Sequence, residues 1–238
     1  MLSALRQHQP PPDAPKAIST EIFSSLINLA GRQRMLSQRI ILNTMLSSLG
    51  HEDALDIAQE ALTLFASTHA DLVEGNKHLP GIFSPALEQA YFGENNADAT
   101  IRRFIQDARQ ALQITDEAHS LSQVQLDRLG KYATPLVTLL NQITQIYEAE
   151  ARQHANQHKK QQQELMENIQ QITKQAKIVS VNAKIIAARA GNAGREFSVV
   201  AGVLANITNE LDELIESSQE QWLLSPKDHS VMQFSYSR

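Results

Sequence analysis

Apolar side chains recur every three or four residues along most of this chain, which is the spacing of an amphipathic helix. Residues 18–49 keep this spacing with no proline and a single glycine, and the segment stops at Leu49-Gly50, where glycine suits a helix end. Residues 52–74 repeat the pattern and are closed by Gly75. The pattern therefore predicts two long helices at the start of the chain.

Residues 76–96 break this pattern because they contain two prolines and two glycines. We expect a connecting loop there, in which Ser84-Pro85 caps and starts a short helix. Helical spacing returns over residues 97–114, and residues 119–133 are expected to be helical with an interruption around Gly130.

Pro135 starts a segment that contains no further proline and no glycine up to about Ala190, and Thr134 is a good residue to cap its start. A single helix of about 56 residues, about 84 Å long, is predicted. Its apolar residues are periodic up to residue 150, nearly absent over residues 151–164, and periodic again from Leu165.

The last part of the chain has the heptad spacing of a coiled coil, with apolar or small residues alternately four and three positions apart. Two such helices joined by a turn that holds Gly191 and Gly194 predict an antiparallel hairpin, which should pair with another copy because it buries little by itself. The heptad positions are Leu165, Ile169, Ile172, Ala176, Val179, Ala183, Ile186 and Ala190, then Phe197, Val200, Leu204, Ile207, Leu211 and Leu214.

Composition supports an all-α protein, with 42% hydrophobic residues but only 5% aromatic residues and nine glycines in 238. The net charge of -5 gives no basic field for nucleic acid. The absence of cysteine removes disulfides and thiolate chemistry and is compatible with a reducing compartment. Residues 1–17 lack the apolar core of a signal peptide and no run reaches the ~18 apolar residues of a membrane span, so we expect a cytoplasmic protein.

Three arginines stand in the first helix, within the segment INLAGRQRMLSQRII. On a helical wheel Arg34 lies in an apolar row, whereas Arg32 and Arg39 share a polar ridge that can face water. A buried guanidinium is costly without an anionic partner, and no Asp or Glu occurs between Glu21 and Glu52. The residues in the apolar row with Arg34 are Phe23, Ile27, Ala30, Ile41 and Met45.

Two interpretations of Arg34 remain open at this point. It pairs with a carboxylate of another helix or extends outward to water, or it grips a small anion together with Arg34 of a second subunit across a twofold interface. Two facing arginines would repel each other by a few kcal/mol at an effective dielectric constant of ~20. An anion bound between them would relieve this repulsion, so ligand binding would be coupled to the geometry of the dimer. Gly31 allows the close approach of a second helix or of a ligand to the backbone.

The segment INLAGRQRMLSQRI resembles the P-box shared by the PilJ-type N-terminal domain of methyl-accepting transducers and the periplasmic domain of nitrate/nitrite sensor kinases. The resemblance implies a four-helix sensory bundle, and it implies that Arg34 contacts nitrate or nitrite at a dimer interface. Ile27, Ala30 and Gly31 would line the same site, with Arg32 and Arg39 as secondary anion contacts.

Residues 172–208 are similar to the hairpin tip of bacterial chemoreceptors, through VNA, AARAG, GR, F and VVA. The resemblance implies that the hairpin signals by contact with proteins, such as a chemotaxis kinase and its coupling protein. This chain departs from the usual tip at Ile186, Asn192, Glu196 and Gly202, and it shows no methylation consensus. The hairpin residues singled out are Asn182, Arg189, Gly191, Gly194, Arg195 and Phe197.

The predicted organisation is a disordered tail (1–17), a PilJ-type four-helix sensory bundle (18–150), a polar helical connector (151–164), a chemoreceptor-like hairpin (165–222) and a second disordered tail (223–238). The predicted function is a homodimeric, non-enzymatic sensor that binds nitrate or nitrite and needs no cofactor. The alternative is a ligand-free coiled-coil protein that assembles with itself or with chemoreceptors. His154 and His158 are spaced for metal binding, but no third ligand is evident, so no metal site is predicted.

Overall fold

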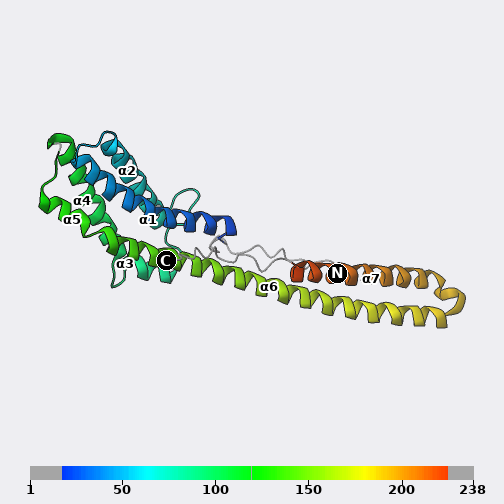
Figure 1. Cartoon of the computed structure of the whole chain (residues 1–238). Helices are drawn as coiled ribbons and strands as arrows, with labels where there is room; N and C mark the ends of the chain where they lie inside the picture. The colour runs from blue at the N-terminus through cyan, green and yellow to red at the C-terminus, as the bar shows by residue number, and fades with distance from the viewer. Residues whose placement is uncertain (1–17, 119, 225–238) are drawn as a thin grey trace, which may run out of the picture. The chain divides into compact units, whose positions relative to one another are not determined.

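The computed structural model describes residues 18–118 and 120–224, and every regular element in these residues is a helix (Figure 1). The chain divides into two compact units, one ending at Ala155 and the other beginning at Asn156. The boundary lies inside the longest helix, α6 (Ala133–Arg189), within the segment predicted as a polar connector. The all-α prediction is confirmed, and the predicted tails lie outside the described residues apart from Leu223 and Leu224, which end α7.

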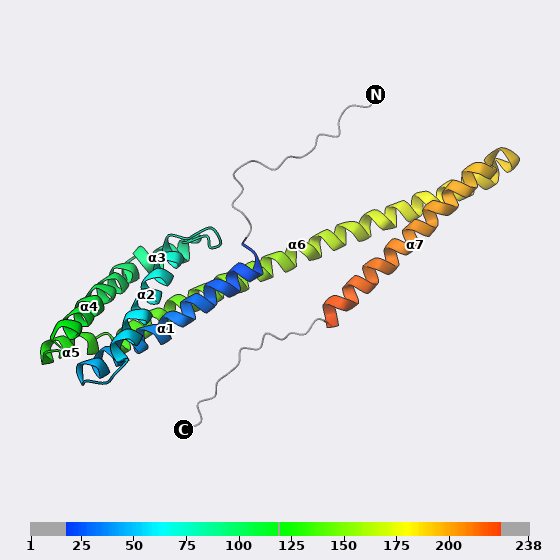
Figure 2. The same cartoon turned by 90° about the horizontal axis from the view of Figure 1, so that it is seen from above.

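The first unit is a four-helix bundle of α1, α2, α4 and the N-terminal part of α6, with α3 and α5 as short connecting helices (Figures 1 and 2). Its helices end close to where the sequence places them. The observed bounds are α1 Thr20–Ser48, α2 Ala54–Val73, α3 Pro85–Phe92, α4 Ala97–Ala118 and α5 Gln123–Gly130.

Local chemistry explains these bounds. Ser84 caps α3 as predicted, because its hydroxyl accepts a hydrogen bond from the backbone N–H of Leu87 at 3.3 Å and Pro85 follows at the first turn. Gly50 and Gly75, which follow α1 and α2, have φ of +83° and +79°, a conformation that favours glycine.

The bundle core contains a central aromatic pair, Phe65 of α2 and Phe104 of α4, whose ring centroids lie 5.4 Å apart in an edge-on arrangement. Helix α6 contributes Leu136, Leu140 and Tyr147 to the same core. The polar part of α6 begins after these residues, so the core explains why apolar periodicity stops near residue 150.

The second unit is an antiparallel hairpin of the C-terminal part of α6, a short turn of 3₁₀ helix (Gly191–Gly194) and α7 (Arg195–Leu224) (Figure 2). The two arms meet through small residues, and we call this contact the small-residue interface. Ser180 is fully buried and donates a hydrogen bond to the carbonyl of Ala201 at 2.8 Å. The members of the small-residue interface step by seven along each arm: Thr173, Ser180 and Ala187 on α6, and Gly194, Ala201 and Thr208 on α7. The next step on α7 is the larger Ile215, which is also buried.

The large heptad residues do not lie in this interface, although a coiled coil of the two arms alone would bury them. Six of them come one position before a buried interface residue, Leu214 before Ile215 and the other five before a small residue, and in antiparallel arms this places these six on the same flank of the hairpin. Between 47% and 64% of each is exposed. We call this surface the apolar flank: Ile172, Val179 and Ile186 on α6, and Val200, Ile207 and Leu214 on α7.

Candidate functional site

Arg34 lies half-buried on α1, and its guanidinium is held by two neutral acceptors. Its Nε donates to the carbonyl of Gly31 at 3.3 Å, and its Nη1 donates to the side-chain oxygen of Asn141 on α6. Among the described residues it forms no ion pair with a carboxylate. Its full positive charge therefore stays uncompensated within the described part of one chain.

The apolar row that contains Arg34 lies at the edge of the core face of α1 and not at its centre. Phe23, Ala30 and Ile41 are buried, but Ile27 and Met45 are only half-buried. The face of α1 that points into the core is centred about 80° away from Arg34, at about 100° per residue. Arg34 therefore lies on the flank of the core face, where a guanidinium can contact both the core edge and a molecule outside.

Gly31 lies directly beside this guanidinium. A Cβ atom added to Gly31 would lie 3.4 Å from Nη2 of Arg34, which is ordinary contact distance. Because glycine carries no side chain, the Arg34 guanidinium can fold back over the turn to the Gly31 carbonyl. A side chain larger than alanine at this position would displace it.

Arg32 and Arg39 are exposed, as the wheel predicted. They lie about 140–160° around α1 from Arg34, at about 100° per residue. The structure therefore does not bring the three arginines together within one chain, and the anion site proposed for Arg34 does not include Arg32 or Arg39.

Sequence reasoning missed a buried polar group at the centre of the core face, Gln33, which is 2% exposed. Its Nε2 donates to the carbonyl of Phe65 on α2 at 2.9 Å, while its Oε1 has no hydrogen-bond partner among the described residues. A heptad pattern that includes polar residues could have indicated Gln33. The residues of this pattern are all buried: Leu26, Ala30, Gln33, Ser37, Ile40 and Thr44.

Sequence reasoning also missed a chain of charged groups that joins α2 to α4. His69 is buried in α2, and its Nε2 lies 2.7 Å from a carboxylate oxygen of Asp98 in the first turn of α4. Arg102 donates from Nε to Asp98 at 2.8 Å and reaches Glu74 at 3.4 Å. No sequence motif marks this group, because its members come from two helices.

The environment of this group shifts two pKa values. Burial lowers the pKa of His69 below its ordinary 6.5, although the hydrogen bond and the charge of Asp98 act in the opposite direction. Burial raises the pKa of Asp98, but hydrogen bonds from Arg102 and His69 outweigh this effect and leave it below its ordinary 3.8. His69 is therefore a neutral donor to an ionised Asp98 at pH 7.

We expect the bundle to lose stability as the pH falls below 6.5. The unfolded chain takes up the His69 proton before the folded chain does, and each such proton lowers the free energy of unfolding by up to about 1.4 kcal/mol per pH unit. Asp98 adds to the loss at a lower pH, below 3.8. The free energy of unfolding, measured with urea between pH 8 and 5, should depend less on pH in His69→Gln than in the intact protein. The control His51→Gln, which changes an exposed histidine, should show the pH dependence of the intact protein. The same pH dependence in both variants would contradict this assignment.

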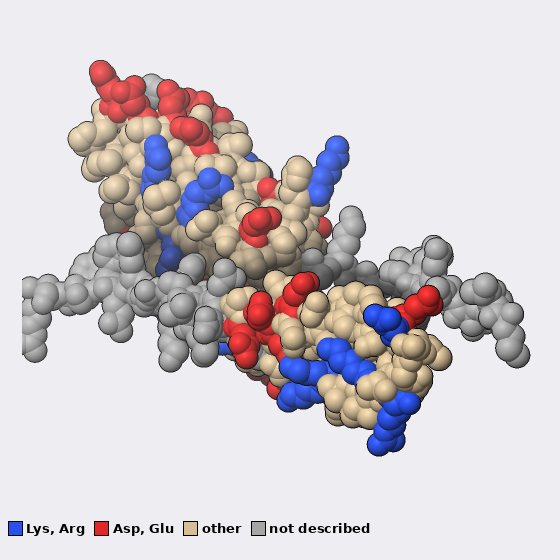
Figure 3. Space-filling model, turned by 90° about the vertical axis from the view of Figure 1, so that its right-hand side faces the viewer, with Lys and Arg blue, Asp and Glu red and all other residues tan. Residues whose placement is uncertain are grey.

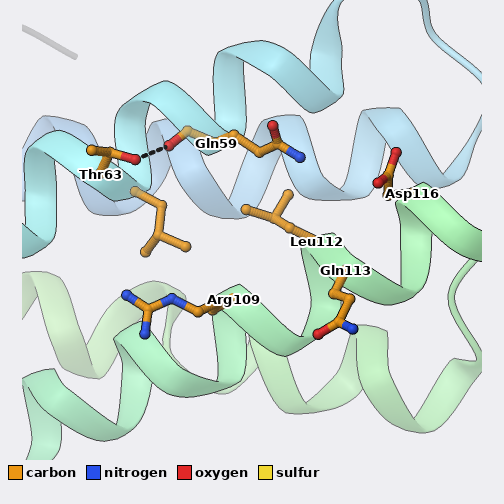
Figure 4. A pocket seen from close by; sticks show the side chains of 7 residues that line it. Gln59, Thr63, Arg109, Leu112, Gln113 and Asp116 are labelled. Atoms are coloured by element: carbon orange, nitrogen blue, oxygen red, sulfur yellow. Dashed lines mark hydrogen bonds between the residues drawn. The ribbon is translucent and has the colours of Figure 1, made fainter.

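A groove of about 380 Å³ runs between α2 and α4 (Figure 4). Gln59 and Thr63 of α2 face Arg109 and Gln113 of α4 across buried leucines. Asp116 also lines it, so the groove contains one charge of each sign. This arrangement does not match a simple anion site.

Most of the hairpin residues that the sequence analysis singled out are exposed at the tip. Asn182, Arg189 and Arg195 are exposed, and Phe197 is 55% exposed. Gly191 has a φ of +59°, which favours glycine. In Figure 3, which faces the tip, Lys and Arg side chains are grouped on the hairpin, where Lys184, Arg189 and Arg195 lie exposed.

No group of three or more His, Cys, Asp or Glu side chains that could hold a metal ion occurs among the described residues. The ring of His154 instead packs against Phe23 at a centroid distance of 5.3 Å. Apolar packing thus accounts for this histidine.

The described residues thus form a helical bundle with an uncompensated arginine on its first helix, and a helical hairpin with an exposed apolar flank. Residues 21–129 match the PilJ family, described as "Type IV pili methyl-accepting chemotaxis transducer N-term". This part of the chain is a PilJ-type domain, and a chemoreceptor-like part follows it.

The chain is also similar to the methyl-accepting chemotaxis protein HlyB of Vibrio cholerae serotype O1 (strain ATCC 39315 / El Tor Inaba N16961). The two are 23% identical over 234 residues, which cover 86% of this chain and 42% of HlyB. The chain thus spans less than half the length of this relative. No solved structure matches the chain.

Within residues 18–118 and 120–224, no helix offers a stretch that is both apolar and long enough to cross a membrane.

Proposed function

We propose that this protein is a homodimeric, non-catalytic sensor that binds nitrate or nitrite through Arg34 of both subunits and signals through its hairpin. The observation that carries the proposal is the half-buried Arg34, which has only neutral partners among the described residues. A guanidinium prefers a planar oxyanion, to which it can donate two parallel hydrogen bonds. Ile27, Ala30 and Gly31 lie beside it on the same helix.

The proposed output is a protein contact of the hairpin, with a chemotaxis kinase, its coupling protein or another signalling protein as partner. The exposed arginines and Phe197 at the tip supply a surface for such a contact. The polar part of α6 would transmit the change, because polar residues at heptad positions pack helices weakly. We propose a cytoplasmic location, with which the cysteine-free sequence is compatible.

One observation favours the alternative, a ligand-free interaction protein. Arg34 already donates to Gly31 and Asn141 within one chain, so it has partners without an anion. In that case the bundle would be a rigid support, and the apolar flank would be the active surface for assembly with itself or with chemoreceptors.

Isothermal titration of the full chain with nitrate, nitrite and chloride distinguishes the two functions. We expect saturable heat with nitrate or nitrite at one ion per dimer, and a loss of about 100-fold or more in affinity for Arg34→Ala, because charged hydrogen bonds from both subunits are removed. Arg39→Ala, an exposed arginine on the same helix, is the matched control and should bind normally. If a folded dimer gives no saturable heat with any of the three anions, the result would favour the alternative.

A further inference from the structure

The outer side of α1 carries a second pocket, separate from Arg34, of about 430 Å³. It lies between α1 and the loop that follows α2. Three polar residues of α1, one histidine of the loop and two leucines line it: Ser25, Asn28, Arg32, His78, Leu29 and Leu79. None of these residues is acidic.

The loop side of the pocket is held in a fixed conformation. The side-chain oxygen of Asn76 accepts hydrogen bonds from the backbone N–H groups of His78 and Leu79 at 2.8 and 3.0 Å. Gly75 and Gly81 approach so closely that a Cβ on Gly75 would lie 2.7 Å from the backbone nitrogen of Gly81. The backbone that carries His78 is therefore positioned before any ligand arrives.

Two acidic residues at the end of α2 already have partners. Asp71 accepts a hydrogen bond from Asn76 at 2.9 Å, and Glu74 pairs with Arg102 at 3.4 Å. Glu21, the other acid on this side of α1, is eleven residues from Arg32, about 16 Å along the helix. The positive charge of Arg32 therefore has no carboxylate partner among the described residues.

The donors in the pocket fit a carboxylate. The Arg32 guanidinium and the Asn28 amide supply N–H groups one turn apart on α1, and neither side chain makes a hydrogen bond to another described group. His78 lines the pocket from the loop side. The Ser25 hydroxyl donates to the Glu21 carbonyl at 2.9 Å, so it contributes little.

The leucines decide which kind of anion fits. Leu29 and Leu79 are half-buried and pack against the bundle core, so they form an apolar wall beside the donors. An inorganic ion such as nitrate has no apolar part to place there, whereas a short alkyl chain would cover the wall. We infer that this pocket binds a short-chain organic carboxylate, with the carboxylate on Arg32 and Asn28 and the alkyl chain against Leu29 and Leu79.

Titration calorimetry of the full chain with sodium butyrate tests this inference. The pocket is open and the ligand is small, so we expect saturable binding with a dissociation constant of about 1 mM. Arg32→Gln should weaken it at least about tenfold, because it removes a charged hydrogen bond. Arg39→Gln, which changes another exposed arginine of α1, should leave it unchanged, and 1-butanol, which lacks the carboxylate, should give no saturable heat.

Two further variants keep this test separate from the proposed nitrate site. Arg34→Ala should still bind butyrate, and Arg32→Gln should still bind whatever inorganic anion the intact protein binds. Absence of saturable heat with butyrate, or equal butyrate affinity in intact protein and Arg32→Gln, would overturn the inference whatever Arg34 does. Circular dichroism confirms that each variant is folded.

Discussion

Replacing Gly194 with alanine is expected to open the hairpin at its tip. A Cβ on Gly194 would lie 2.1 Å from the carbonyl oxygen of Ala187, far inside contact distance, and backbone atoms cannot swing away as a flexible side chain does. The arms must separate at this layer, at an expected cost of at least about 3 kcal/mol. Because the small-residue interface steps by seven from this layer, the loss should extend to Ser180 and Ala201.

Hydrogen exchange measured by mass spectrometry checks this result. Amides around Ala187 and Ala201 should lose protection in Gly194→Ala. The matched control is Gly202→Ala, because a Cβ there meets nothing within 4 Å and alanine favours a helix. If both variants keep the exchange pattern of the intact protein, the close contact between Gly194 and Ala187 does not hold the hairpin.

The hairpin is expected to pair with a second copy, and we propose that it does so through the apolar flank. Introducing a charge into this flank is expected to weaken that pairing strongly. Val179 is 59% exposed in one chain and would be buried against the second copy. Val179→Glu removes apolar contact and adds a buried charge on both subunits, with an expected loss of about 4 kcal/mol in total, or about a thousandfold in the dimer dissociation constant.

Sedimentation at a series of protein concentrations measures this change. Gln175→Glu places the same charge on an exposed polar position of α6 and should leave the dimer intact. A Val179→Glu protein that remains dimeric at the same concentrations would show that the apolar flank is not the surface through which the copies associate.

Much of the fold followed from the sequence because it depends on local chemistry. The run without proline or glycine after Pro135 sets the length of α6. The helix begins at Ala133, however, so Thr134, which was predicted to cap its start, lies inside it. Ser84-Pro85 and Gly75 set helix ends through capping and positive φ. The helical period also placed Arg32 and Arg39 on a face exposed to water. Each of these features is determined within a few residues of chain.

The candidate site depended on contacts that no local pattern contains. The period of α1 fixes the angle between Arg34 and Ala30, but the helices packed against α1 decide which direction is the core. They centre it near Gln33 and leave Arg34 on its flank, where it meets Asn141, 107 residues away. The His69–Asp98 pair arises in the same way, from two helices brought together.

The sequence by itself determined that the chain is helical, where most helices start and stop, and which residues are unusual: the arginines of α1 and the glycines of the hairpin turn. Only the tertiary structure decided that the two arms meet through residues one position after the predicted heptad residues. Small residues let the two arms approach closely, so Ser180 and Ala201 fill the contact and the larger Val179 and Val200 are left on the flank. Spacing is the same for both sets, and only the packing of one helix against another distinguishes them.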